Sequence, residues 1–144
     1  MSRFLFDVNT VLAILDPRHV FHDAAHGWLG RQNDLHWLTS PLVQNGVIRV
    51  ASNTRYPNHL GTAGQVRGVL QEFCNDGRHE FCPDDVSLLD NTRLARPELL
   101  TPLSVTDLYL VALAQHHRAQ LATFDARIPA AAIRGGQGAL LIIE

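Results

Sequence analysis

The sequence predicts an α/β fold in which a mainly parallel sheet is covered on both faces by helices. Short apolar runs such as Arg3–Phe6 and Leu121–Phe124 have the length and composition of buried strands. These runs alternate with stretches of helical periodicity, of which "SVTDLYLVALAQHHRAQ" (Ser104–Gln120) is the clearest. Such alternation is typical of a parallel sheet. No repeat, linker or low-complexity segment interrupts the pattern, so residues 1–144 are predicted to form a single domain.

In the N-terminal half, each predicted strand leads directly into a helix. The stretch "TSPLVQNGVIRV" begins with Ser40 as a helix cap and Pro41 in a position that the first turn tolerates. One polar residue, Gln44, lies near the start of this otherwise apolar helix. The elements predicted here are strand Arg3–Phe6, helix Asn9–Pro17, helix His19–Arg31, strand Leu35–Ser40 and helix Thr39–Val50.

In the C-terminal half, Ser52–Thr62 is expected to be a loop because it is rich in Asn, Pro and Gly. The dense apolar residues of Ser104–Gln120 predict a largely buried helix, and "RGGQG" (Arg134–Gly138) predicts a turn before the last strand. The elements predicted here are helix Ala63–Cys74, strand His79–Pro83, short helix Ser87–Arg93, helix Ser104–Gln120, strand Leu121–Phe124 and strand Ala139–Ile143.

The composition narrows the class of protein. A hydrophobic content of 46% with 18% charged residues is typical of a soluble globular protein and excludes a disordered one. The net charge of −2 excludes a strongly basic protein but leaves room for a local nucleic-acid-binding patch. Two cysteines are too few for a disulfide framework, so free thiols in a reducing cytoplasm are expected. The apolar start contains Asp7, Asn9 and Asp16, which favours a strand and helix over a signal peptide, and no run is long enough for a membrane.

Three aspartates are predicted to meet at one edge of the sheet. Asp7 follows the run "RFLF", Asp125 follows "LATF", and Asp107 lies at the start of the buried helix. The carboxyl ends of parallel strands face the ligand crevice of an open α/β sheet. Each aspartate alone has a simpler explanation as a helix cap or turn residue. The convergence of all three at one edge favours a functional site.

Clustered carboxylates repel one another and stay ionised together only beside a cation. Oxygen ligands of this kind suit Mg²⁺ or Mn²⁺ better than zinc. Such a site supports metal-assisted hydrolysis of a phosphodiester, in which the metal activates water and neutralises charge on the phosphate.

Other chemistries have weaker support in the sequence. The eight histidines lack H-E-x-x-H spacing, and the adjacent His116 and His117 are expected to face different ways on the surface of a helix. Cys74 and Cys82 lack partners for a zinc site, and no phosphate-binding glycine loop is present. Receiver domains and aspartate-nucleophile phosphatases use a lysine beside the acyl phosphate, and this chain has no lysine.

Four segments in order resemble the PIN domain, and specifically the VapC-type toxins of bacterial toxin–antitoxin pairs. They are "FLFDVNTVLAIL", "TSPLVQNGVIRVAS", "LSVTDLYLVALAQ" and "LATFDARI". The resemblance covers nearly the whole chain and implies a three-layer α/β/α sandwich with a central, mainly parallel sheet. It also implies a Mg²⁺- or Mn²⁺-dependent endoribonuclease in the cytoplasm, usually a homodimer, which a cognate VapB-type antitoxin inhibits.

The resemblance assigns roles residue by residue. The first, third and fourth acids of the family match Asp7, Asp107 and Asp125, which would hold the metal. Asn9 and Thr123 fall in the same segments as supporting polar residues. The second acid of the family is a glutamate, and Gln44 stands at that position.

The departure at Gln44 leaves two explanations open. The chain is either a natural relative with a weakened site or a variant inactivated by a Glu→Gln change. Losing one charge about 4–6 Å from a metal weakens its binding by on the order of 1–4 kcal/mol. If position 44 lies in the metal site, Gln44→Glu should raise Mn²⁺ affinity and ribonuclease activity. Without the resemblance, a polar residue in the first turn of a helix is usually solvated or part of a cap, and this is the favoured interpretation of Gln44.

The sequence therefore leaves three functions open: an endoribonuclease toxin, a catalytically silent PIN module that binds only RNA or antitoxin, and a metal-free structural domain. Single-stranded RNA is the expected target, because its phosphates and bases are exposed. The RNA-binding residues are not identified by sequence. The arginines that could form a phosphate-binding rim are Arg49, Arg55, Arg67, Arg93 and Arg96.

Overall fold

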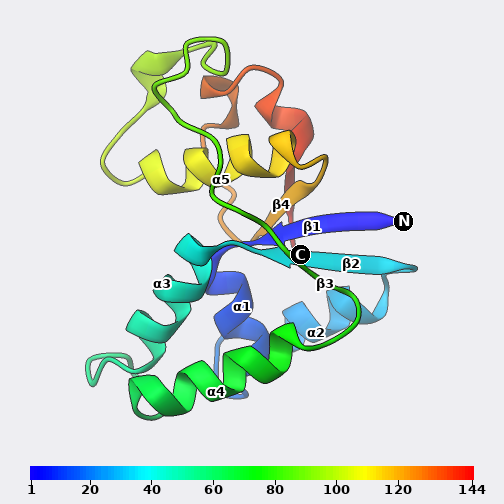
Figure 1. Cartoon of the computed structure of the whole chain (residues 1–144), viewed down its shortest axis with the longest axis vertical. Helices are drawn as coiled ribbons and strands as arrows, with labels where there is room; N and C mark the ends of the chain where they lie inside the picture. Colours follow the sequence, from blue (N-terminus) through cyan, green and yellow to red (C-terminus); the bar gives the residue numbers. More distant parts are fainter.

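Five short strands form a parallel sheet at the centre of the protein (Figure 1). In the computed structural model, which describes residues 1–144, the strand order is β3-β2-β1-β4-β5, and every neighbouring pair is parallel. The predicted α/β class with a parallel sheet is therefore confirmed. The strands are β1 (Ser2–Phe6), β2 (Leu35–Thr39), β3 (His79–Phe81), β4 (Gln120–Thr123) and β5 (Leu140–Ile142).

Helices cover both faces of this sheet, as predicted. Figure 1 shows α1 to α4 on one side, where α1 contacts α2 and α3, and α3 contacts α4. On the other side, α5 packs on β4 together with short 3₁₀ segments at Ala130–Ala132 and Gly136–Ala139. None of the helices combines the length and apolar character needed to cross a bilayer. The helices are α1 (Val8–Leu15), α2 (His22–Gly30), α3 (Pro41–Ala51), α4 (Ala63–Cys74) and α5 (Val105–His116).

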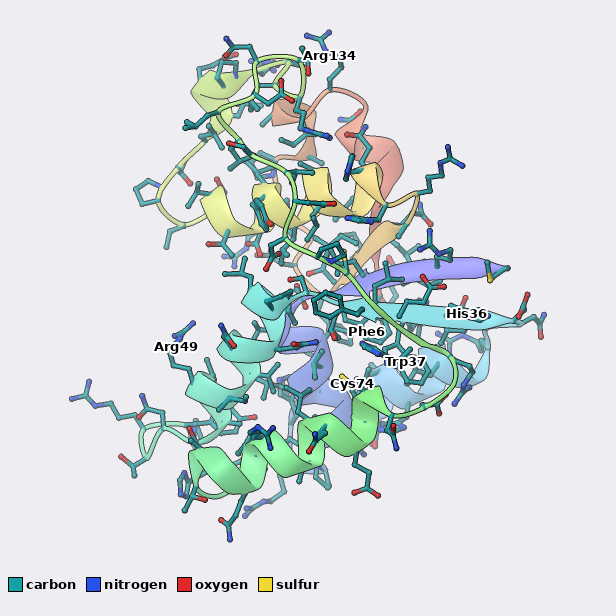
Figure 2. The ribbon with its side chains drawn as sticks, viewed as in Figure 1. Phe6, His36, Trp37, Arg49, Cys74 and Arg134 are labelled. Carbon is teal, nitrogen blue, oxygen red and sulfur yellow. The ribbon has the colours of Figure 1, made fainter.

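The core lies between the sheet and its helices. Leu5, Phe6 and Leu38 have no more than 1% of their surface exposed. Phe6 stacks parallel to Trp37 at 6.5 Å between ring centroids, and Figure 2 shows both rings beside the sheet. Phe6 also meets Trp28 of α2 edge to face at 6.2 Å. These aromatic contacts fix α2 against the strands that carry the site.

Local signals explain where the helices begin and end. Ser40 caps α3 by accepting from the Val43 N–H, as predicted. Helix α5 ends at His116, four residues before the predicted end, because Arg118 takes a left-handed conformation (φ 57°). The chain then turns back and Gln120 already pairs in β4.

The short helix predicted at Ser87–Arg93 is wrong. This segment forms turns in which side chains occupy the backbone donors. The Ser87 hydroxyl accepts from the Leu89 N–H, and Asp90 Oδ1 accepts from both the N–H and the hydroxyl of Thr92. Such local bonds offer the backbone an alternative to helical bonds. The two cysteines are free thiols, as expected.

Candidate active site

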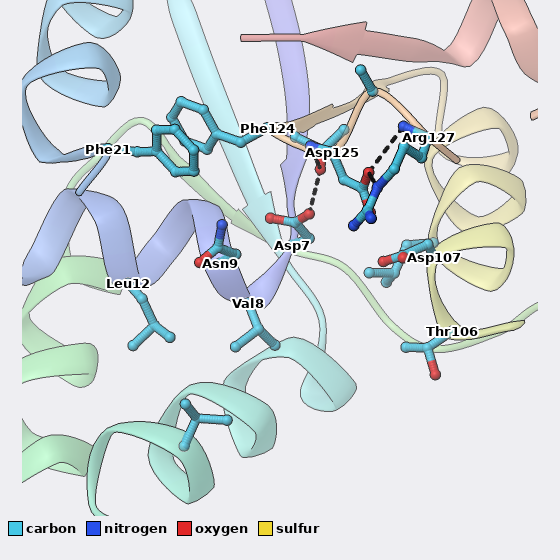
Figure 3. Close-up of a pocket in the computed structure, with 14 residues that line it drawn as sticks. Asp7, Val8, Asn9, Leu12, Phe21, Thr106, Asp107, Phe124, Asp125 and Arg127 are labelled. Carbon is cyan, nitrogen blue, oxygen red and sulfur yellow. Dashed lines mark hydrogen bonds and ion pairs between the residues drawn. The ribbon is translucent and has the colours of Figure 1, made fainter. Parts of the chain in front are cut away.

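The main cavity of the protein opens where the strand order reverses. β1 leads into α1 on one face of the sheet, whereas the segment after β4 passes to the face of α5. In open α/β sheets such a switch point is the usual position of a ligand crevice. The cavity here has a volume of about 770 Å³. All three predicted aspartates, together with Asn9 and Thr123, line it (Figure 3).

Asp7 is buried and both of its carboxylate oxygens are engaged. It caps α1, because Oδ1 accepts from the Thr10 N–H at 2.8 Å. Oδ2 accepts from the Thr123 hydroxyl of β4 at 2.6 Å. Only 7% of the residue surface is exposed. Asp7 therefore both starts a helix and presents a fixed carboxylate to the cavity.

Thr123 links two of the aspartates. Its hydroxyl donates to Asp7 and accepts from the Asp125 N–H at 3.1 Å. The Asp125 carboxylate in turn accepts from the backbone N–H of Arg127 at 2.9 Å and from its guanidinium at 3.2 Å. These bonds, led by the backbone bond, hold the pKa of Asp125 below its usual range. Asp125 is thus a fixed anion at the edge of the cavity, and the Thr123 hydroxyl bonds to both Asp7 and Asp125.

Asp107 is the aspartate of this group whose negative charge is least favourable. It lies in the first turn of α5 and is partly buried. Burial, followed by the negative charges of Asp7 and Asp125, raises the pKa of Asp107 to about 6. The charges of the other two aspartates therefore reach Asp107, as expected for carboxylates that share one cavity. The arrangement favours a bound cation, since a cation relieves this repulsion.

The raised pKa of Asp107 makes the stability of the metal-free protein depend on pH. Between about pH 4 and pH 6 the folded chain holds a proton that the unfolded chain releases, so stability falls as pH rises through this window. After discounting for partial exposure, we expect a loss of about 1–2 kcal/mol in this range. Urea unfolding in EDTA from pH 4 to pH 7 should show it in the wild type and not in Asp107→Asn. Parallel stability curves for the two proteins would contradict the assignment.

Asn9 is held in place from outside the cavity. Its Oδ1 lies 2.9 Å from His19 Nε2, and His19 Nδ1 accepts from the Phe21 N–H. Burial lowers the pKa of His19, so a neutral ring that donates from Nε2 to Asn9 fits both contacts. Asn9 therefore presents its amide to the cavity in a defined orientation.

Gln44 is not among the residues that line this cavity. Its amide nitrogen donates to the Thr39 hydroxyl at 3.0 Å, and the side chain lines a second cavity between α3 and α4. The Thr39 hydroxyl also lies 2.7 Å from His79 Nε2. Burial lowers the pKa of His79, which favours a neutral ring that accepts from Thr39. An uncharged amide at position 44 completes this chain as a donor.

Sequence reasoning missed the aromatic and basic residues of the cavity. Phe21 and Phe124 stack at 4.6 Å between centroids with an interplanar angle of 4°, beside Asp7 (Figure 3). Arg127 is the arginine of this cavity, whereas the five arginines predicted as a rim do not line it. Arg49 instead extends from α3 away from the sheet (Figure 2). The sequence did contain a signal for Arg127, because in "FDAR" it follows the predicted site residue Asp125 by two positions.

Most of the chain matches a known protein family and several of its members. The family model for the PIN domain matches residues 4–134. Ribonuclease VapC44 of Mycobacterium tuberculosis is 39% identical over 133 residues, which cover 92% of this chain and 93% of the relative. Ribonuclease VapC39 of the same organism is 33% identical over 91% of this chain and 94% of its own. A crystal structure of VapBC2 from Rickettsia felis, bound to a DNA fragment from their promoter, matches with a TM-score of 0.56. It has 16% identity and covers 89% of this chain and 94% of that chain, so it supports the fold alone.

Proposed function

Since the chain belongs to the PIN-domain family and resembles its VapC-type ribonucleases, we propose that it is a metal-dependent endoribonuclease. It would hydrolyse RNA phosphodiester bonds as the toxin of a toxin–antitoxin pair. The observation that carries the proposal is the convergence of Asp7, Asp107 and Asp125 on one cavity at the switch point of the sheet. Each comes from a different element, so the fold brings together three carboxylates that are far apart in the chain.

The donor set fits a hard divalent cation. Three carboxylates supply oxygen ligands, and the raised pKa of Asp107 supports the view that their charges are not fully balanced without a cation. We propose that these three aspartates hold Mg²⁺ or Mn²⁺. When bound, such an ion lowers the pKa of a water ligand and stabilises charge on the phosphate.

The other residues of the cavity would position the RNA. The Thr123 hydroxyl fixes the Asp7 carboxylate, and Asn9 offers an amide that can bond a phosphate or water. Arg127 is 91% exposed in its side chain, so it can contact a phosphate at the edge of the site. The Phe21–Phe124 pair offers an aromatic face for an unpaired base next to the cleavage point. Single-stranded RNA is therefore the proposed substrate class.

A cognate VapB-type antitoxin and a homodimer complete the proposal, which places the chain in the cytoplasm. Exposed apolar side chains support contacts of this kind near the cavity: Leu42 at the start of α3, and Leu103 and Val105 at the start of α5. Asp84 joins these two helix ends by accepting from the Leu42 N–H and the Tyr109 hydroxyl. We propose that a second chain covers these exposed apolar side chains.

The alternative is a catalytically silent PIN module that binds RNA or antitoxin without cleavage. Single-stranded RNA incubated with the purified chain and Mn²⁺ separates the two, beside Gln44→Glu and Asp7→Asn variants. Cleavage by the wild type or by Gln44→Glu, but not by Asp7→Asn, supports the ribonuclease. Binding of RNA without cleavage in all three favours the silent module.

Two variants that add the same negative charge test whether position 44 lies beside the proposed metal. A glutamate there cannot donate to Thr39, so we expect Gln44→Glu to lower the free energy of unfolding by about 1 kcal/mol. Gln71 lines the same second cavity and is exposed, so Gln71→Glu adds the same charge without breaking that bond. Urea unfolding and Mn²⁺ calorimetry of both variants are the measurements, and Mn²⁺ affinity should change little. A gain in Mn²⁺ affinity of about tenfold would instead place position 44 beside the metal, as the family resemblance predicts.

A further inference from the structure

A second group of metal-ligating side chains lies at the other end of α5. Asp85, His116 and His117 each offer one ligand atom, and these atoms lie within 4.8 Å of one another. His116 follows Asp107 by nine residues, which is roughly 13 Å of helix. This group is therefore separate from the acidic cavity, and what it binds does not depend on the proposed ribonuclease activity.

The two histidines converge although neighbouring helical residues normally diverge. The expectation that they face different ways is wrong, because His117 lies just past the end of α5 and its backbone has left the helical conformation. His117 Nε2 lies 2.7 Å from Asp85 Oδ1, and His116 Nε2 lies 3.7 Å from Asp85 Oδ2. Both rings thus direct the same nitrogen toward one carboxylate.

Asp85 is held over the helix end by its neighbours in the chain. The segment that follows β3 runs past the sheet toward α5 (Figure 1). Asp84 anchors it through the Tyr109 hydroxyl of α5 and the Leu42 N–H of α3. The bond from His117 holds the pKa of Asp85 below its usual range, so this carboxylate is available as an anion. The negative end of the α5 dipole adds to the attraction for a cation.

We propose that Asp85, His116 and His117 form a second cation site, selective for a borderline transition metal such as Zn²⁺, Co²⁺ or Ni²⁺. Two imidazoles with one carboxylate suit these ions, whereas Mg²⁺ prefers oxygen ligands alone. A tetrahedral ion with bonds of about 2.1 Å places its ligands about 3.4 Å apart. Small rotations of the exposed Asp85 and His116 and of the partly buried His117 would give this spacing, and water would fill the remaining positions. The bound ion would tie the segment after β3 to the end of α5.

Arg93, a neighbour of His116, carries a positive charge that disfavours a bound cation. Arg93 donates from Nη2 to His116 Nδ1 at 3.1 Å. A neutral imidazole that accepts at Nδ1 carries its proton on Nε2, so the ion must displace this contact before Nε2 can bind it. Arg93→Gln removes the positive charge and supplies an oxygen that can accept from Nδ1–H. We therefore expect Arg93→Gln to bind the ion more tightly than the wild type.

Calorimetric titration of the EDTA-treated, dialysed full chain with Zn²⁺ tests the proposal. We expect a Zn²⁺ site that persists in Asp7→Asn, in which the acidic cavity has lost a ligand, and that weakens about tenfold or more in Asp85→Asn and His117→Gln. His59→Gln changes an exposed histidine outside the group and should leave the site unchanged. If His117→Gln fails to fold, His116→Gln serves instead, because that side chain is 41% exposed. Unchanged Zn²⁺ binding in Asp85→Asn and in either histidine variant, or loss of the site in Asp7→Asn, would overturn the proposal.

Discussion

Asp7→Asn is expected to lower Mn²⁺-dependent cleavage of single-stranded RNA by at least about a hundredfold while the chain stays folded. Asp7 is one of three carboxylates in the cavity, and its removal leaves two negative charges to hold a divalent ion. Loss of one electrostatic contact at a reaction centre commonly costs a factor of about 10²–10³ in rate. The effect should appear both in the cleavage rate and in the Mn²⁺ dissociation constant.

Asparagine is the appropriate substitute because it preserves the structural role of Asp7. Its oxygen can still accept from the Thr10 N–H, and Asn caps helices about as well as Asp. Its amide group faces the Thr123 hydroxyl, which can accept from it as well as from the Asp125 N–H. Asp23→Asn, an exposed carboxylate on α2, is the matched control and should cleave like the wild type. Equal activity of the two variants would remove Asp7 from the site.

Asp16→Ala is expected to have the largest effect on stability, a loss of about 2–4 kcal/mol in the free energy of unfolding. Asp16 ends α1 and is fully buried. Its Oδ2 accepts from the Tyr56 hydroxyl and from the Asn58 amide, each at 2.6 Å, and its Oδ1 accepts from the Arg18 N–H. A carboxylate at the end of a helix opposes the helix dipole, so these bonds are what make it tolerable. Its removal leaves their donors without an acceptor and frees the loop between α3 and α4.

The pH dependence of Asp16 provides a second measurement. Burial raises its pKa, but the hydrogen bonds from Tyr56, Asn58 and Arg18 together outweigh burial and lower it overall. The stabilisation is therefore present above the ordinary pKa near 4 and is lost as pH falls below it. Tyr56→Phe removes only one of the bonds and should cost about 1 kcal/mol. Urea unfolding that found Asp16→Ala no less stable than Tyr56→Phe at pH 7 would refute this view of the network. A deficit of Asp16→Ala against the wild type that did not shrink as pH falls below about 4 would refute it as well.

Much of the fold was predictable because local and long-range signals agree. The apolar runs before Asp7 and Asp125 form β1 and β4, and the capping residue Ser40 starts α3 where predicted. Predictions failed where a single backbone angle or a side-chain bond decided the outcome. The left-handed residue Arg118 shortens α5, and turn bonds replace the helix expected at Ser87–Arg93. Neither effect has a periodic pattern in the sequence.

The candidate site was predictable to the same degree. Strand ends and chain order were enough to bring Asp7, Asp107 and Asp125 to one cavity. The contacts of Gln44 were not foreseeable, because they depend on how far a side chain turns toward Thr39 rather than on its place in the helix. The Phe21–Phe124 pair joins residues more than a hundred positions apart, and no strand pairing links them.

The double use of Asp7 has a consequence for how this family member can drift in evolution. On the proposed toxin function, the product of this gene harms its own cell, so mutations that silence it accumulate. Replacement of Asp107 removes a repelled carboxylate and relieves the metal-free fold, whereas most replacements of Asp7 also remove the cap of α1. Silenced descendants that keep their fold should therefore have lost Asp107 more often than Asp7. Among those that lost Asp7, asparagine should be the commonest successor.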